Sequence, residues 1–183
     1  MKKDIKKYTI SVYSENISGL LGKIAQIFTR RKINIDSLTT SDSEIKGIHR
    51  FTIVIHEKPE TVRKLVQQIE KIIDVFVAFY YEEDEIISQE IALYKLASKT
   101  LLGSNLEKIV RQNGARILYV DEEFCVIEKT GINEETEQLF EVLKPFGILE
   151  FVRSGRVSIS KPTPNLHEYL KSVGIASEFK VTL

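Results

Sequence analysis

A short polar turn holds the residues of this sequence that are best suited to bind a small ligand. An amphipathic helix is predicted to begin at Leu20, and the turn before it consists of Asn16, Ile17, Ser18 and Gly19. The amino end of a helix presents backbone N–H groups without helical partners and a partial positive charge. A glycine there lets a small anion such as an α-carboxylate reach the backbone, and Asn16 can accept hydrogen bonds from an α-ammonium group. The turn is therefore a candidate site for a small amino acid.

A second amide, Asn34, interrupts an apolar stretch between Ile33 and Ile35, where the predicted helix leads into a strand. A buried amide needs hydrogen-bond partners, so Asn34 is a candidate second group that fixes the ligand. Asparagines at turns also satisfy neighbouring backbone groups through their own amides. From the residues alone, Asn16 and Asn34 are equally well explained as ligand-binding groups and as local turn residues.

No combination of side chains predicts catalysis or a metal centre. Catalysis needs a nucleophile with a base, a carboxylate pair or a metal cluster, and the common motifs for these are absent from the sequence. His49 and His56 are an odd number of residues apart on one predicted strand, so they point to opposite faces. Cys125 lies among apolar residues of another strand and is expected to be buried. We therefore expect no enzyme activity, no catalytic residue, no bound metal and no cofactor in this chain.

The composition, with 43% hydrophobic residues, is typical of a globular protein. The 26 Lys and Arg residues balance the 26 Asp and Glu residues, so no overall field attracts nucleic acid or an anionic membrane. No apolar run approaches the roughly 18 residues of a membrane span, and we expect a cytoplasmic protein. RNA-binding sheets have the element order βαββαβ, but their basic aromatic signature is absent from this sequence, so no nucleic-acid partner is expected.

Periodicity predicts the elements that position the turn. Alternating apolar residues indicate a strand over residues 6–14, and helical spacing follows the turn. The next predicted elements are strands over Ile33–Ser41 and Ile48–His56, a helix that begins at Pro59, and a strand over Val75–Tyr81. The order βαββαβ gives an antiparallel four-stranded sheet with both helices on one face, which is a ferredoxin-like sandwich.

The same pattern repeats after an acidic run at residues 82–85. The repeat consists of a strand over Ile91–Ala97, a helix over Leu102–Gln112, strands over Ala115–Val120 and Phe124–Lys129, a helix from Asn133 or Glu134, and a strand over Ile148–Val152. The sequence therefore predicts an α+β fold of two ferredoxin-like βαββαβ sandwiches.

The predicted domains are residues 1–82, which carry the turn, and residues 90–161, with residues 83–89 as a solvated acidic linker. Residues 162–183 form a tail, in which Asn165 can cap a short helix from Leu166 to Val173. Because the tail has too little apolar surface to fold alone, we expect it to dock on the second domain or on a partner.

Three segments of the first domain strongly resemble an ACT domain: Glu15-Asn16-x-Ser18-Gly19-Leu20-Leu21, the helix end Phe28-Thr29-Arg30-Arg31, and Ile33-Asn34-Ile35-Asp36-Ser37-Leu38-Thr39. Together with Ile91-Ala92-Leu93-Tyr94-Lys95-Leu96 and Arg153-Ser154-Gly155, they resemble the family of small regulatory subunits of acetohydroxyacid (acetolactate) synthase. The resemblance covers roughly residues 6–160, and it makes the second domain ACT-like. Many ACT domains share the turn alone, whereas the ordered set across two domains is specific.

The resemblance implies a function and partners. Such a subunit binds and activates the catalytic large subunit of acetolactate synthase and confers feedback inhibition by valine in branched-chain amino-acid biosynthesis. Thiamine diphosphate, Mg and FAD are expected in that catalytic subunit. The family pattern places the effector between the ACT domains of a homodimer. By motif match, the effector-binding residues are Asn16, Gly19 and Asn34, while Ile17, Ser18 and Leu20 line the same turn.

Three features depart from the family pattern: a short hairpin turn at residues 43–47, several Lys and Tyr residues in place of aliphatic ones, and the tail beyond Lys161. None touches the turn, but the tail leaves the partner-facing surface open. Two other functions stay open at this point. One is a free-standing ACT amino-acid sensor that regulates another enzyme or a transcription factor, and the other is a dimerisation module that binds no ligand.

Overall fold

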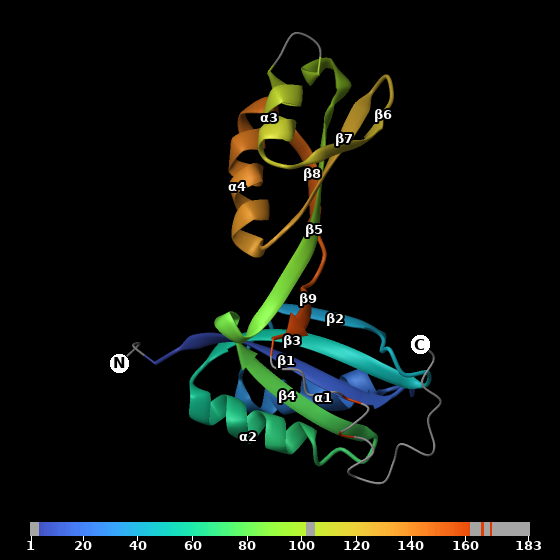
Figure 1. Ribbon diagram of the computed structural model, residues 1–183, viewed down its shortest axis with the longest axis vertical. Helices are drawn as coiled ribbons and strands as arrows, with labels where there is room; N and C mark the ends of the chain where they lie inside the picture. Colours follow the sequence, from blue (N-terminus) through green and yellow to red (C-terminus); the bar gives the residue numbers. More distant parts are fainter. Residues whose placement is uncertain (1–3, 102–104, 162–165, 167–168, 170–183) are drawn as a thin grey trace. The chain divides into compact units, whose positions relative to one another are not determined.

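The computed structural model describes residues 4–101, 105–161, 166 and 169. The chain divides into two compact units, of which the second comprises Ser88–Val157 and the first comprises the residues on either side of it. Each unit has the order βαββαβ, as predicted (Figure 1). Every helix in this described part is too short or too polar to cross a lipid bilayer.

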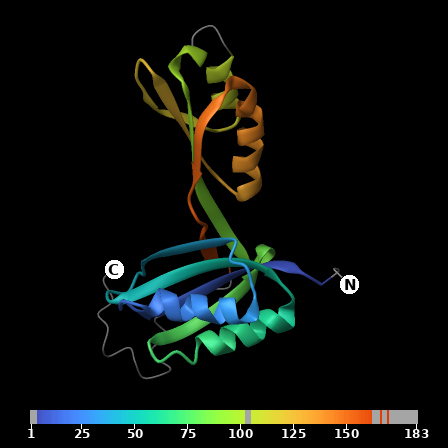
Figure 2. The same cartoon turned by 180° about the vertical axis from the view of Figure 1, so that it is seen from behind.

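The first unit is a four-stranded antiparallel sheet with two helices on one face (Figures 1 and 2). Its elements are β1 (Lys6–Glu15), α1 (Leu20–Arg31), β2 (Ser37–Asp42), β3 (Ile48–Glu57), α2 (Pro59–Ile69) and β4 (Val75–Glu82). The strand order is β2-β3-β1-β4, so β1 lies in the middle of the sheet. Tyr8, Ile10 and Val12 alternate along β1 and pack with the apolar faces of both helices in one core. The predicted ferredoxin-like sandwich is confirmed.

The second unit repeats this arrangement with the order β6-β7-β5-β8. Its elements are β5 (Ile86–Ala97), α3 (Leu106–Gln112), β6 (Arg116–Val120), β7 (Phe124–Gly131), α4 (Asn133–Leu143) and β8 (Ile148–Arg153). The predicted start of its first helix, Leu102, lies outside the described residues. Cys125 is fully buried in the core of this unit, as expected, and burial raises the pKa of its thiol.

The acidic run is more ordered than the predicted linker. Glu83–Glu85 form a single 3-10 turn, η1, and β5 begins directly after it at Ile86. The backbone N–H of Glu82 donates to the Glu85 carboxylate at 2.8 Å, and Lys6 forms an ion pair with Glu82 at 2.7 Å. The carboxylates of Glu82 and Glu85 thus stabilise this turn through a hydrogen bond and an ion pair, which a hydropathy pattern does not reveal. Two further 3-10 turns are η2 (Ser98–Thr100) and η3 (Lys144–Phe146), and a short strand β9 (Val157–Ser160) pairs with β5.

The connection from α1 to β2 differs from the prediction, because the strand begins at Ser37 and not at Ile33. Lys32 adopts a left-handed conformation with φ 56° and donates its N–H to the Thr29 carbonyl at 3.0 Å. The N–H of Ile33 donates to the Phe28 carbonyl at 3.0 Å, which completes a Schellman cap. Ile33 therefore closes a helix although its residue type favours a strand, and Asn34 lies exposed in the loop that follows.

Replacing Lys32 by glycine is expected to stabilise the first unit by about 1 kcal/mol, because a left-handed backbone strains a residue with a Cβ atom. Urea unfolding measures this change. Arg30→Gly, which removes an equal charge from the regular part of α1, should instead destabilise the unit by about 1 kcal/mol. Equal effects of the two substitutions would show that charge and not backbone conformation controls this helix end.

A buried tyrosine gives the second unit a predictable response to alkaline pH. The Tyr94 hydroxyl is enclosed and donates to the Thr136 carbonyl at 2.6 Å, and burial raises the pKa of Tyr94 to about 12. Because this folded pKa exceeds the unfolded value, the contribution of the hydroxyl is complete below pH 10 and is lost as the pH rises from 10 to 12.

Tyr94→Phe is therefore expected to destabilise this unit by about 1 kcal/mol at pH 8, and the difference from the unsubstituted protein should shrink above pH 10. Denaturant unfolding at a series of pH values tests this. Tyr80→Phe, at a ring that is 40% exposed in the first unit, is the control and should leave the second unit unchanged. A difference that stays constant up to pH 12 would contradict the role of the hydroxyl.

The second face of the first unit's sheet, opposite the helices, is partly covered by the C-terminal segment. Leu166 is only 3% exposed and packs in one cluster with Tyr13, Ile45, Ile48 and Val77. The expectation that the tail docks on the second domain or on a partner is therefore wrong for Leu166. Thr9 and Ser11, which precede Tyr13 on this face, are polar, so the sequence pattern of β1 does not indicate an apolar docking surface here.

Candidate functional site

The predicted turn connects the end of β1 to the start of α1, as expected. Asn16 and Ile17 have no regular structure, and Ser18 and Gly19 form a turn. All four residues are exposed. Gly19 is the N-cap of α1 with φ 85° and ψ −9°, a left-handed conformation. A Cβ atom placed on Gly19 would meet nothing within 4 Å. The backbone at this position thus favours glycine, and the space next to it is open.

The amino end of α1 is electrostatically suited to an anion. Among the described residues, no side chain caps this end and no acidic residue lies in the first helical turn. The N–H groups of this turn therefore keep the partial positive charge of a helix terminus. Lys23, one turn further along, forms an ion pair with Asp74 at 2.8 Å, and its N–H donates to the Gly19 carbonyl at 3.1 Å.

Three exposed apolar residues lie in the segments next to this helix end. Ile17 and Leu21 are 39% and 42% exposed, and Ile73 in the loop before β4 is 97% exposed. That loop is held beside the turn because the Glu15 N–H donates to the Asp74 carbonyl at 3.0 Å. An anion-attracting backbone with apolar neighbours can bind a ligand that has a carboxylate and an aliphatic side chain.

The six predicted site residues do not all offer their side chains to this place. The Leu20 side chain is 1% exposed and belongs to the core, so it leaves only its backbone to the turn. Ile17 is half-exposed, and sequence reasoning passed over its apolar neighbours Leu21 and Ile73. In the sequence, such residues could be found only as apolar residues at positions predicted to be exposed. Ordinary protein surfaces contain many residues of this kind, so the pattern does not identify a site.

Asn34 lies at the opposite end of the sheet from the turn of the same chain. The Asp36 N–H donates to the Val54 carbonyl at 2.9 Å, and Val54 pairs with Thr9 of β1. The start of β2 is therefore level with Thr9, whereas the turn follows Glu15, six residues and about 20 Å further along β1. One chain does not bring Asn34 and Asn16 together.

The two neighbouring histidines serve the hairpin. His49 on β3 contacts Asp42, its partner on β2, at 2.7 Å. His56, also on β3, contacts Asp36, which directly precedes β2, at 2.7 Å. In the described ranges, no group of three or more His, Cys, Asp or Glu side chains is placed to hold a metal ion.

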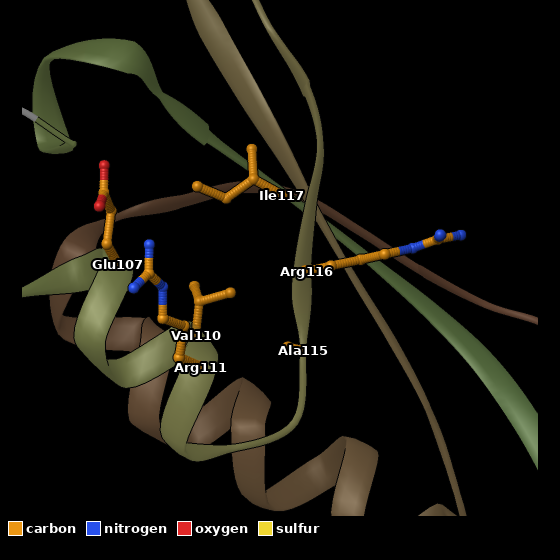
Figure 3. A pocket seen from close by; sticks show the side chains of 6 residues that line it. All are labelled: Glu107, Val110, Arg111, Ala115, Arg116 and Ile117. Carbon is orange, nitrogen blue, oxygen red and sulfur yellow. The ribbon is translucent and has the colours of Figure 1, made fainter.

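A cleft of about 320 Å³ lies in the second unit, between α3 and β6, and contains none of the predicted residues (Figure 3). Its lining residues are Glu107, Val110, Arg111, Ala115, Arg116 and Ile117. Arg116 points away from α3 and forms an ion pair with Glu128 (Figure 3). The cleft therefore combines a small apolar floor with one acidic and one basic side chain at its rim.

Comparison with known proteins places both units in one family. Residues 10–77 match the family model described as an AHAS small subunit-like ACT domain, and residues 89–162 match the model described as small subunit of acetolactate synthase. The two matches follow the two compact units in sequence.

Curated relatives match most of the chain. The acetolactate synthase small subunit of Mycobacterium leprae is 35% identical over 154 residues, which cover 84% of this chain and 91% of the relative. That of Bacillus subtilis is 32% identical over 170 residues, which cover 92% of this chain and 99% of the relative. The crystal structure of the acetolactate synthase small subunit from Thermotoga maritima superposes with a TM-score of 0.79 at 25% identity and covers 87% of this chain and 99% of that one. This chain therefore belongs to the family of acetolactate synthase small subunits.

Proposed function

We propose that this chain is the non-catalytic regulatory subunit of an acetolactate synthase, that it activates a catalytic subunit, and that valine inhibits the complex by binding at the turn Asn16–Gly19. Thiamine diphosphate, Mg and FAD are assigned to the catalytic subunit. The main support for the effector site is the conformation of Gly19. Its left-handed backbone leaves the uncapped amino end of α1 open to solvent.

The chemistry of the turn suits an amino-acid effector. The α-carboxylate binds to the N–H groups at the amino end of α1, which attract anions. The α-ammonium group donates to the Asn16 side-chain oxygen. Ile17, Leu21 and Ile73, all exposed in the single chain, supply apolar surface to the aliphatic side chain. A carboxylate, an ammonium and an aliphatic group are the parts of valine.

A homodimer completes the site. Asn34 lies at the other end of α1 from Asn16, so a two-fold axis that sets the α1 helices of two copies antiparallel brings Asn16 of one copy beside Asn34 of the other. Each of the two equivalent sites then contains one amide from each chain. In this arrangement the effector also covers Ile17 and Leu21, which water contacts in the single chain.

Inhibition requires that valine bind two states of the complex with different affinity, because equal binding shifts no equilibrium. We expect valine to favour the closed dimer with an ordered turn, and thereby to change the surface that the subunit offers its catalytic partner. A coupling free energy of about 1–3 kcal/mol is typical of such regulation.

Reconstitution tests this function. The catalytic subunit of the same organism is assayed for acetolactate formation alone, with this chain, and with this chain plus valine. We expect this chain to raise the rate and valine to lower it again. Valine binding without any effect on acetolactate formation would instead identify a free-standing amino-acid sensor, and the absence of binding by every branched-chain amino acid would identify a dimerisation module.

A further inference from the structure

The C-terminal segment contacts the first unit next to the end of β1. Leu166 is buried against Tyr13, and the Tyr169 ring packs edge-on to Phe79 with centroids 5.9 Å apart. Phe79 in turn packs edge-on to Tyr13 at 6.3 Å. Two side chains from the end of the sequence are thus linked by direct packing to a residue that lies three positions before Asn16.

This contact lies over an irregularity in the sheet. Tyr13 pairs with Val77 and Ser14 pairs with Val75, so Phe76 is an extra residue that forms a bulge in β4. Phe76 packs against the same cluster as Leu166 and Tyr13. A bulge interrupts the ladder and changes the direction of the strands, so the packing around it determines how the last residues of β1 leave the sheet.

The turn begins where this bulge ends. Ser14 is fully buried and its hydroxyl donates to the Glu15 carbonyl at 3.0 Å, while the Glu15 N–H is bound by Asp74. The backbone between Tyr13 and Asn16 therefore has few alternative conformations as long as the Tyr13 side chain is fixed. Tyr13 is fixed by Leu166 and Phe79 and by the Arg50 guanidinium, which lies 5.6 Å from its ring centre.

We propose that Leu166 and Tyr169 are positioning residues for the turn Asn16–Gly19: their side chains pack in the cluster at the β4 bulge, fix the end of β1, and thereby set the conformation in which the turn binds its amino acid. The predicted effect on valine affinity rests on the proposed function. Leu166 lies beyond residue 162, where the match to the family model ends, but within the stretch that matches the Bacillus subtilis relative.

The experiment compares the full-length chain with Leu166→Ala and Tyr169→Ala, singly and combined. Hydrogen exchange read by mass spectrometry reports the opening of residues 14–22, and calorimetry reports the valine Kd. We expect the double variant to exchange about tenfold faster in residues 14–22 and to bind valine about tenfold more weakly, because local opening is favoured while the rest of the fold persists. Leu166→Met, which keeps the apolar volume, should leave the exchange rate of residues 14–22 and the valine Kd as they are in the unsubstituted chain.

Ile159→Ala is the matched control, since Ile159 lies on the same C-terminal segment but is 71% exposed. It should change neither readout. Unchanged exchange at residues 14–22 in the double variant would overturn the proposal, and so would faster exchange with an unchanged valine Kd. If the unsubstituted chain binds no valine, the proposed function fails, while the exchange measurement still decides whether the tail fixes the turn.

Discussion

Asn16→Ala chains and Asn34→Ala chains are each expected to lose valine binding, and heterodimers of the two are expected to regain a single site with the original affinity. The reason is the distance of about 20 Å along the sheet between these amides in one chain. If each site takes one amide from each copy, the heterodimer has one site with both amides and one site with neither.

Isolation of the heterodimer through two different affinity tags allows calorimetry to count its sites. The expected result is one valine per heterodimer, against two per dimer for the unsubstituted protein and none for either variant alone. A heterodimer of two differently tagged Asn16→Ala chains is the control and should bind none. If the tagged mixed heterodimer also binds none, both amides of a site come from the same chain and the composite site is wrong.

Gly19→Asp is expected to raise the valine Kd at least about 100-fold, equivalent to about 2.7 kcal/mol. A carboxylate at this position competes with the effector carboxylate for the same N–H groups and repels it. The substitution should cost only about 1 kcal/mol of stability, because a Cβ atom on Gly19 has open space and only the left-handed backbone opposes it.

Gly22→Ala is the matched control for this substitution. Gly22 lies in the same helix, is exposed, and would also place a Cβ atom in open space, but its backbone is helical. Alanine there should stabilise the first unit by about 0.5–1 kcal/mol and leave the valine Kd within about twofold. Wild-type valine affinity of Gly19→Asp would exclude the turn as the carboxylate site.

Periodicity was sufficient to predict the fold, because the helices of both units and strands such as β5 and β7 bury apolar side chains at the spacing of their element. Tyr8, Ile10 and Val12 in the first unit and the buried Cys125 in the second are side chains whose positions follow directly from alternation. The start of α1 at Leu20 was also predictable, because a glycine directly precedes the helical spacing. Gly19 adopts a left-handed conformation that residues with a Cβ atom rarely adopt.

The errors arose where hydrogen bonds and charges outweigh hydropathy. Ile33 was assigned to a strand, but its N–H completes a helix cap. Residues 86–89 were assigned to the acidic linker, but they form the start of β5. The docking surface of Leu166 depends on which side chains from distant strands share a face, and the sequence pattern of one strand does not contain that information.

The candidate site was only partly predictable for a related reason. The sequence identified the turn from residue types that tolerate unusual backbone geometry, and it paired Asn16 with Asn34 through a family resemblance. The topology separates these amides in a single chain, so a site that contains both would require a second copy. That the Leu20 side chain lies inside and that Ile73 lies outside follows from packing, which residue types alone do not specify.

The Gly19 backbone has a consequence for the evolution of effector choice. In the proposed site, main-chain N–H groups at the amino end of α1 would contact the part of the ligand that all α-amino acids share, so they would not distinguish one amino acid from another. Discrimination would then depend on Ile17, Leu21 and Ile73, whose exposed side chains contribute little to the core. Substitutions at these three positions would retune the subunit from one metabolite to another at almost no expense in folding. The feedback specificity of a whole biosynthetic pathway would thus depend on a few surface side chains, while the means of holding an amino acid stays fixed in the backbone.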